Sequence, residues 1–115
     1  MYDVFVISPY TDDDQNVVCD RVAAAERYLA SLTMEDVVAY STIAAMHHLT
    51  VKFSLPNDYE YWKDHCHKMI SSAKEVYVLC LDGWENSVGV QDELSIAREL
   101  NKKITYIHTF PQSNK

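Results

Sequence analysis

Residues 75–101 read EVYVLCLDGWENSVGVQDELSIARELN, and this stretch decides the fold. Its first seven residues carry no charge after Glu75 and predict a buried strand, because a parallel strand covered on both faces is apolar throughout. Apolar residues then recur every three or four positions and predict a helix over 89–101. The residues of this apolar face are Val90, Leu94, Ala97 and Leu100. A strand followed by a loop and a helix is the repeating unit of a parallel α/β sheet.

The rest of the chain repeats this alternation of strands and helices. The other predicted strands are 2–8, 37–40 and 104–108. A long amphipathic helix is predicted over 14–32, where Asp12 and Gln15 have the spacing of a capping box. Ser41 is expected to cap a short helix over 43–49.

The order of these elements predicts a small three-layer α/β/α sandwich, flavodoxin- or Rossmann-like, with a mainly parallel sheet of four to five strands. A further helix, capped by Asn57 or Asp58, completes the set. We expect a single domain over 1–110 and a short polar tail over 111–115, since 115 residues is an ordinary length for one domain.

Composition excludes several classes of function. The chain carries 10 Lys and Arg residues against 17 Asp and Glu residues, a formal net charge of −7. A nucleic-acid interface needs a basic face, so no nucleic-acid partner is expected. No apolar run approaches the roughly 20 residues of a membrane span, so no membrane partner is expected. Three widely spaced cysteines without a CxxC pair favour reduced thiols in a cytoplasmic protein.

The topology alone predicts where a ligand binds, because ligands of such sheets bind beyond the carboxyl ends of the strands. Three segments are expected to meet there: 8–10, 41–48 and 82–93. The last segment holds Gly83 and Gly89, the only two glycines of the chain. The first follows a strand, where a tight turn can require a positive φ, and the second opens a helix, where the backbone can approach a ligand closely.

The segment 82–93 also carries the residues best suited to chemistry. Ser87 is the expected N-cap of its helix, and the free amides of a helix N-terminus bind anions. Glu93 is the candidate catalytic carboxylate, as nucleophile or general base. The alternative is that it only complements the helix dipole. The ligand-binding candidates are Ser8, Tyr10, Asp82, Gly83, Trp84, Ser87, Gly89 and Val90.

Aromatic side chains offer a surface for a nucleobase. Tyr10 and Trp84 are expected to sandwich a base, because aromatic faces stack well on such rings. The alternative for Trp84 is packing against the last helix. Tyr59 and Trp62, three residues apart on a helix, are expected in the core.

Histidine and cysteine residues give little support to a metal site. His65, Cys66 and His67 resemble a metal cluster in composition, but residues two apart on a helix point in opposite directions. A zinc site needs three or four convergent ligands, so neither a metal nor a cofactor is expected. His47 and His48 are expected on a solvated helix face, with ligand contact as the alternative.

Several motifs together indicate a family. The chain combines SPY at 8–10, Arg21 in the first predicted helix, YxYW at 59–62, LDGW at 81–84 and SVGVQDE at 87–93. In this combination it resembles a phage and bacterial family of uncharacterised domains that is grouped with the nucleoside 2-deoxyribosyltransferase-like proteins. The resemblance covers nearly the whole chain and implies a cytoplasmic protein, in the host cytoplasm if phage-encoded.

The resemblance implies roles for two residues. In that superfamily a glutamate at the position of Glu93 attacks the anomeric carbon, or stabilises the oxocarbenium-like state, while the base departs. A serine at the position of Ser87 contacts the 5′-phosphate in the branch that cleaves nucleoside monophosphates. The resemblance thus implies a nucleotide- or nucleoside-binding protein with N-glycosidase or deoxyribosyltransferase activity. Related folds complete their sites across a dimer, which implies a homodimer or a higher even oligomer.

One departure from the superfamily pattern supports other functions. Its members carry a second carboxylate in the helix before the third strand. The nearest positions here hold Cys66 and Met69, and Asp64 lies about half a helical turn away. Without a proton donor for the departing base, the protein would be a non-catalytic binder that sequesters or senses a nucleotide-derived small molecule. A further alternative is a structural or interaction protein on an inherited fold.

Overall fold

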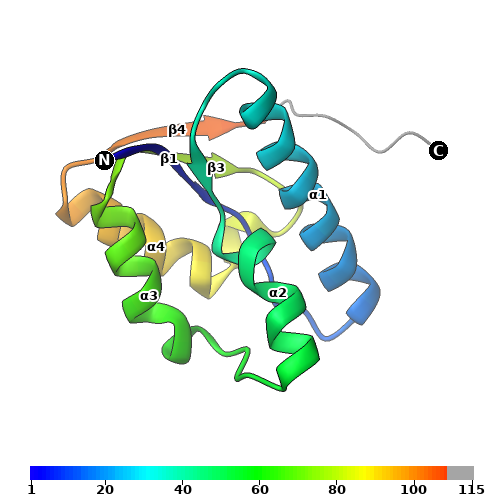
Figure 1. Ribbon diagram of the computed structural model, residues 1–115. Helices are drawn as coiled ribbons and strands as arrows, with labels where there is room; N and C mark the ends of the chain where they lie inside the picture. The colour runs from blue at the N-terminus through cyan, green and yellow to red at the C-terminus, as the bar shows by residue number, and fades with distance from the viewer. Residues whose placement is uncertain (109–115) are drawn as a thin grey trace.

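The computed structural model describes residues 1–108, which fold into four strands and four α-helices (Figure 1). The strands are β1 (Tyr2–Ile7), β2 (Ala39–Tyr40), β3 (Ala73–Leu79) and β4 (Lys103–Ile107). The helices are α1 (Gln15–Met34), α2 (Thr42–Phe53), α3 (Tyr59–Ser71) and α4 (Val88–Glu99). A short 3₁₀ helix, Trp84–Asn86, precedes α4 and was not predicted from the sequence.

All neighbouring strands pair in parallel, in the order β2-β1-β3-β4. This arrangement confirms the predicted parallel sheet of four to five strands, and its order is that of a doubly wound fold. The chain runs from β1 outward to β2 and then crosses back to β3. The direction of winding therefore reverses between β1 and β3, and a crevice opens at that point beyond the carboxyl ends of the strands.

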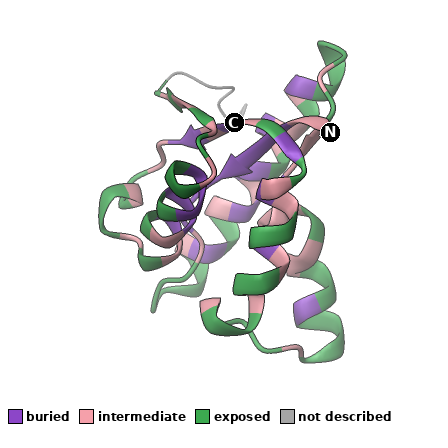
Figure 2. Ribbon diagram, turned by 90° about the vertical axis from the view of Figure 1, so that its left-hand side faces the viewer, coloured by how far each residue is buried: buried purple, intermediate pink, exposed green. Residues whose placement is uncertain are grey.

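Two helical layers cover the two faces of the sheet (Figure 2), which confirms the predicted three-layer sandwich. Alternate residues of a strand point to opposite faces, so Val4 and Val6 pack with α1 while Phe5 and Ile7 pack with α3 and α4. The two central strands, β1 and β3, are accordingly largely buried, whereas the edge strands β2 and β4 and the outward sides of the helices are more exposed (Figure 2). Helix α2 packs against α1 near the crevice.

Side chains at the helix starts explain why the helices begin where they do. Ser41, Asp58 and Ser87 each accept a hydrogen bond from a first-turn amide, which confirms them as the N-caps of α2, α3 and α4. The predicted capping box of α1 is wrong. Asp14 caps this helix by accepting from the amide of Asn16, and Asp12 accepts instead from the amide of Asp14.

Some sequence-based expectations concern residues or properties that the structure does not test. The polar tail predicted over 111–115 lies outside the described residues. Within residues 1–108 no helix is both long and apolar enough to cross a membrane.

The expected homodimer or higher even oligomer stays a prediction. Leu49, Val51 and Phe53 are exposed apolar residues on α2.

The two glycines are predicted to respond in opposite ways to substitution by alanine. Gly83 has a φ of +86°, and a Cβ there would lie 2.7 Å from Nη2 of Arg21. Gly83→Ala should therefore lower the free energy of unfolding by about 1–2 kcal/mol. Gly89 lies in α4, where a Cβ would meet only ordinary contacts, the nearest 3.5 Å away at Tyr59 Cδ1. Gly89→Ala should leave stability unchanged or raise it by up to about 1 kcal/mol.

Urea denaturation of the two variants beside the wild type measures both effects. Each variant is the control for the other, because the chemical change is the same. Equal losses of stability at the two positions would contradict this account of the loop.

Candidate functional site

A cavity of about 430 Å³ lies at the carboxyl ends of the strands. Its volume falls in the range of small-molecule sites, roughly 300–1,000 Å³. The lining residues are Ser8, Tyr10, Thr11, Thr42, Ile43, Met46, His47, Thr50, Asn57, Asp58, Tyr59, Trp62, Cys66, Ser87, Val88, Gly89 and Glu93. All three segments that were predicted to meet at this edge contribute to this list, and α3 adds a fourth wall.

Glu93 supplies a buried carboxyl group to the cavity wall. Its side chain is on the first turns of α4, and the residue is only 8% exposed. Burial raises the pKa of Glu93 to about 7, although a hydrogen bond with Cys66 acts to lower it, and the nearby charge of Asp92 raises it further. Glu93 thus exchanges its proton near neutral pH, which is a property of catalytic carboxyl groups.

Cys66 of α3 faces Glu93 across the cavity wall. The thiol is 2% exposed, and its Sγ lies 3.4 Å from Oγ1 of Thr42. Burial raises the pKa of Cys66 far above its usual range, and the neighbouring Glu93 raises it as well. The thiol therefore stays protonated and donates to the carboxylate. It occupies one of the two positions at which the resemblance implied a second carboxylate, while Asp64 is exposed.

Two hydroxyl groups in the cavity wall have no hydrogen-bond partner among the described residues. They are Oγ of Ser8, a residue only 4% exposed, and the buried Oη of Tyr59. Burying a hydroxyl without a partner costs about 1–3 kcal/mol. Such groups bind polar atoms of a ligand readily, because the cost of removing them from water has already been met.

Tyr10 and His47 form a pair on the opposite side of the cavity. Oη of Tyr10 and Nδ1 of His47 share a hydrogen bond of 2.8 Å. Burial lowers the pKa of His47, and so does the adjacent His48, so the imidazole is neutral at pH 7. His47 is half-buried and lines the cavity, so ligand contact, the alternative to a solvated helix face, stays a prediction for this residue. The expectation of a solvated face holds for His48, which is exposed beside Glu26.

The cavity includes only part of the predicted ligand-binding set. Ser8, Tyr10, Ser87, Gly89 and Glu93 all line it. Ser87 also caps α4, since its Oγ accepts from the amide of Val90 at 3.3 Å. The remaining candidates lie elsewhere.

The Asp82–Trp84 loop and Val90 are not in the cavity wall. Asp82 and Gly83 line a separate depression beside Arg21, whose guanidinium donates to the carbonyl of Asp82. Trp84 packs on Tyr106, with ring centroids 5.6 Å apart, so the expected aromatic sandwich with Tyr10 is not formed. The side chain of Val90 is fully buried in the core.

The contribution of α3 was not predicted from the sequence. Tyr59 and Trp62 were expected in the core, and they do pack against it, but they line the cavity as well. Apolar residues at helical spacing indicate a buried face without showing whether a protein layer or a ligand covers it. The aromatic character of this face was the only available signal.

Metal ligands do not converge in the part of the chain that the structure describes. Among residues 1–108, no group of three or more His, Cys, Asp or Glu side chains is arranged to hold a metal ion.

Comparison with known protein families identifies the family of this chain. Residues 2–109 match the family described as "Domain of unknown function (DUF1937)", and the chain belongs to that family. A comparison with curated proteins finds no match.

The buried Glu93 should make stability depend on pH. Between pH 4.5 and 7 the folded protein keeps a proton that the unfolded chain has released, because the pKa is raised on folding. The free energy of unfolding should therefore fall as pH rises through this window, by about 3 kcal/mol in total. Glu93→Gln mimics the protonated carboxyl and should be more stable than wild type by up to that amount at pH 8, but not at pH 4.5.

Urea denaturation at the two pH values measures the difference between variant and wild type. Glu99→Gln, at an exposed position of the same helix, serves as the control and should change stability by less than about 0.5 kcal/mol at either pH. A Glu93→Gln effect of the same size at pH 4.5 and pH 8 would refute the buried, proton-exchanging carboxyl.

Proposed function

We propose that this member of the DUF1937 family binds a nucleotide or nucleoside and breaks its N-glycosidic bond, by hydrolysis or by base exchange, through Glu93. The observation that carries the proposal is the buried carboxyl group of Glu93 in the wall of a ligand-sized cavity. This cavity lies at the edge of the sheet where doubly wound folds bind their ligands.

The chemistry follows from a carboxylate that faces the anomeric carbon. Glu93 in its ionised form attacks C1′ or stabilises the positive charge that develops there, and the base leaves with the electron pair of the broken bond. Water or a second base then displaces the carboxylate. A pKa of about 7 leaves an appreciable fraction of Glu93 ionised at neutral pH.

The other walls of the cavity suit the parts of a nucleoside. Trp62, Tyr59 and Tyr10 offer aromatic surface for the base. The unpartnered hydroxyl of Ser8 and the side chain of Thr42 offer hydrogen bonds for sugar hydroxyl groups. Near Ser87, the first-turn amides of Val88 and Gly89 have no partner within α4 and can bind an oxygen of the ligand.

The resemblance to the nucleoside 2-deoxyribosyltransferase-like proteins supports the same assignment. The glutamate that acts on the anomeric carbon in that superfamily matches Glu93, which the fold brings into the cavity. The position of Ser87 relative to Glu93 also follows the pattern. Ser87 and Glu93 lie on one strand–loop–helix unit. Their separation in the sequence therefore sets their relative positions in the site.

A non-catalytic binder is the second candidate, and one observation favours it. Glu93 is the only buried carboxyl group that lines the cavity in residues 1–108, and Cys66 stands across from it. The open cavity argues against a purely structural role, for which side chains would fill the site.

Release of free base tests the catalytic proposal directly. The wild type is incubated with 2′-deoxynucleosides and their 5′-monophosphates, with and without an acceptor base, and the products are separated by chromatography. Glu93→Gln should reduce base release by about 100-fold or more, because no other buried carboxyl group of residues 1–108 lines the cavity. Glu99→Gln should release base at the wild-type rate.

Equal release by wild type and Glu93→Gln would overturn the catalytic role. Binding without any base release, measured by calorimetry on the same samples, would establish the binder instead.

The pH profile of base release gives a second test. Glu93 acts as a carboxylate, so kcat/KM should rise with pH and level off above the pKa of about 7. A rate that falls across this range would assign Glu93 the role of a general acid. Rates between pH 5.5 and 8.5 on a single responsive substrate decide between the two.

A further inference from the structure

The cavity has an unusual charge for a site that would hold a phosphate group. None of its lining residues is a lysine or an arginine among the residues that the structure describes. Two of them are acids, Glu93 and Asp58. The chain as a whole carries a formal net charge of −7, so the long-range field does not favour an anion either.

The lysines and arginines among residues 1–108 line no part of the cavity. Arg21 is the cation joined to the cavity wall by a hydrogen bond, but Nη1 donates to the carbonyl of Thr11 and Nη2 to the carbonyl of Asp82, both at 2.9 Å. Its guanidinium faces the separate depression next to Gly83. Lys74 and Lys103 lie at the amino ends of their strands, at the opposite edge of the sheet from the cavity.

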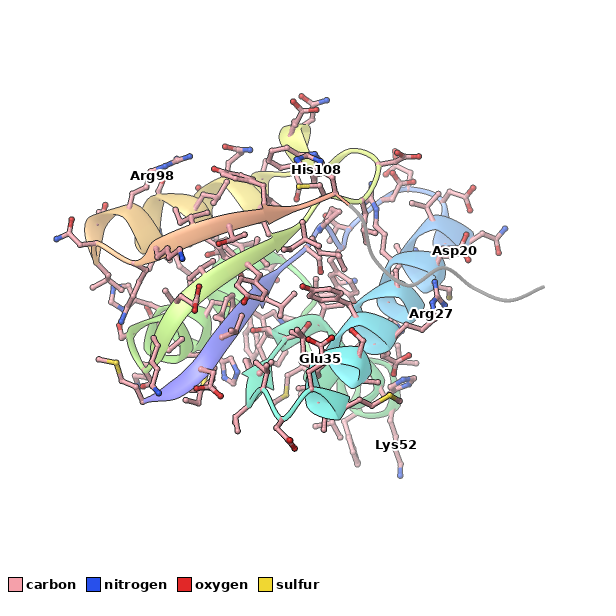
Figure 3. The ribbon with its side chains drawn as sticks, turned by 90° about the horizontal axis from the view of Figure 1, so that it is seen from above. Asp20, Arg27, Glu35, Lys52, Arg98 and His108 are labelled. Atoms are coloured by element: carbon pink, nitrogen blue, oxygen red, sulfur yellow. The ribbon has the colours of Figure 1, made fainter. Side chains whose placement is uncertain are left out.

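The outer surfaces of the helices carry further cations. Figure 3 shows Lys52 projecting away from the end of α2 and Arg98 from the outer side of α4. Both are exposed residues that line no part of the cavity.

The electropositive features of the wall are three helix N-termini, because the first residues of α2, α3 and α4 (Thr42, Tyr59 and Val88) all line the cavity. Each N-terminus contributes about half a positive charge. Ser87 already uses its Oγ on the amide of Val90, which leaves the amides of Val88 and Gly89. Against these partial charges stand the carboxylate of Asp58 and the partly ionised Glu93, whereas a phosphate monoester brings nearly two negative charges at pH 7. The helix ends therefore do little more than offset the two acids, and the described residues of the wall offer no full positive charge to a phosphate group.

The polar groups of the cavity wall that are free to bind a ligand are neutral hydroxyl groups and a carboxyl group. Oγ of Ser8 and Oη of Tyr59 are buried without a hydrogen-bond partner in the described part of the chain, and Glu93 accepts hydrogen bonds in its ionised form. Hydroxyl groups of a sugar satisfy such a set, since each can donate as well as accept. Trp62 and Met46 add apolar surface beside them for a ring.

We infer that the cavity takes an uncharged, hydroxyl-bearing ligand with an aromatic ring, and that it discriminates against a phosphate group. This inference rests on the proposed function, within which it names the free nucleoside rather than the nucleoside 5′-monophosphate as the substrate. It differs from what the serine at position 87 implies by resemblance alone.

Calorimetry with matched pairs of ligands tests the inference. The probes are the four common 2′-deoxynucleosides and their 5′-monophosphates at pH 7.5 and low salt. At least one nucleoside should bind with a Kd about tenfold or more below that of its own monophosphate. A monophosphate that binds as tightly as its nucleoside, or more tightly, overturns the inference while the proposed function stands. No binding by any of the eight probes overturns the proposed function and the inference together.

A pair of variants makes the electrostatic cause testable. Val88 lines the cavity at the start of α4 and is 71% exposed, so Val88→Lys adds a cation at the site without disturbing the core. Val38→Lys is the matched control, because Val38 is similarly exposed, at 63%, and precedes β2 at the opposite edge of the sheet. Val88→Lys should tighten monophosphate binding about tenfold relative to nucleoside binding.

Val38→Lys should change neither affinity. The inference fails if Val88→Lys tightens nucleoside and monophosphate alike, if it tightens neither, or if Val38→Lys has the same effect.

Discussion

Every strand of the sheet runs in the same direction, and this constraint places the carboxyl ends of β1, β2 and β3 on one edge. Because the winding reverses between β1 and β3, the helices that follow these strands diverge there and leave room for a cavity. The residues that follow β1, those that open α2 and those that open α4 all reach this space. The site is therefore a consequence of the chain's topology before it is a consequence of any particular side chain.

Within that space the fold keeps a carboxyl group out of water. The burial of Glu93 raises its pKa to about 7, and the protonated thiol of Cys66 only partly compensates. A group whose pKa is raised on folding lowers stability at neutral pH, as does a buried hydroxyl without a partner, such as that of Ser8. Costs of this kind are expected at sites arranged for a ligand rather than for stability.

The sequence predicts most of the framework. The order of strands and helices along the chain, the caps at Ser41 and Ser87 and the meeting of three segments follow from hydrophobic period, capping chemistry and topology. The placement of Trp84 does not follow from the sequence. The path of its loop depends on the positive φ of Gly83 and on contacts with Arg21, which is distant in the sequence. The position of Tyr59 in the cavity wall does not follow from the sequence for another reason. The same side of α3 packs against the core and lines the cavity, and the apolar pattern does not separate the two.

The central claim is that the cavity beside Glu93 is the ligand site. Titration of the ¹⁵N-labelled protein with 2′-deoxynucleosides, followed by amide chemical shifts, tests it most directly. The account predicts shifts concentrated at Ser8–Tyr10, in α2 around His47 and at Ser87–Glu93, with the amides of Asp82–Trp84 much less affected. Shifts centred on the depression around Arg21 and Gly83, or at the amino ends of the strands, would contradict it.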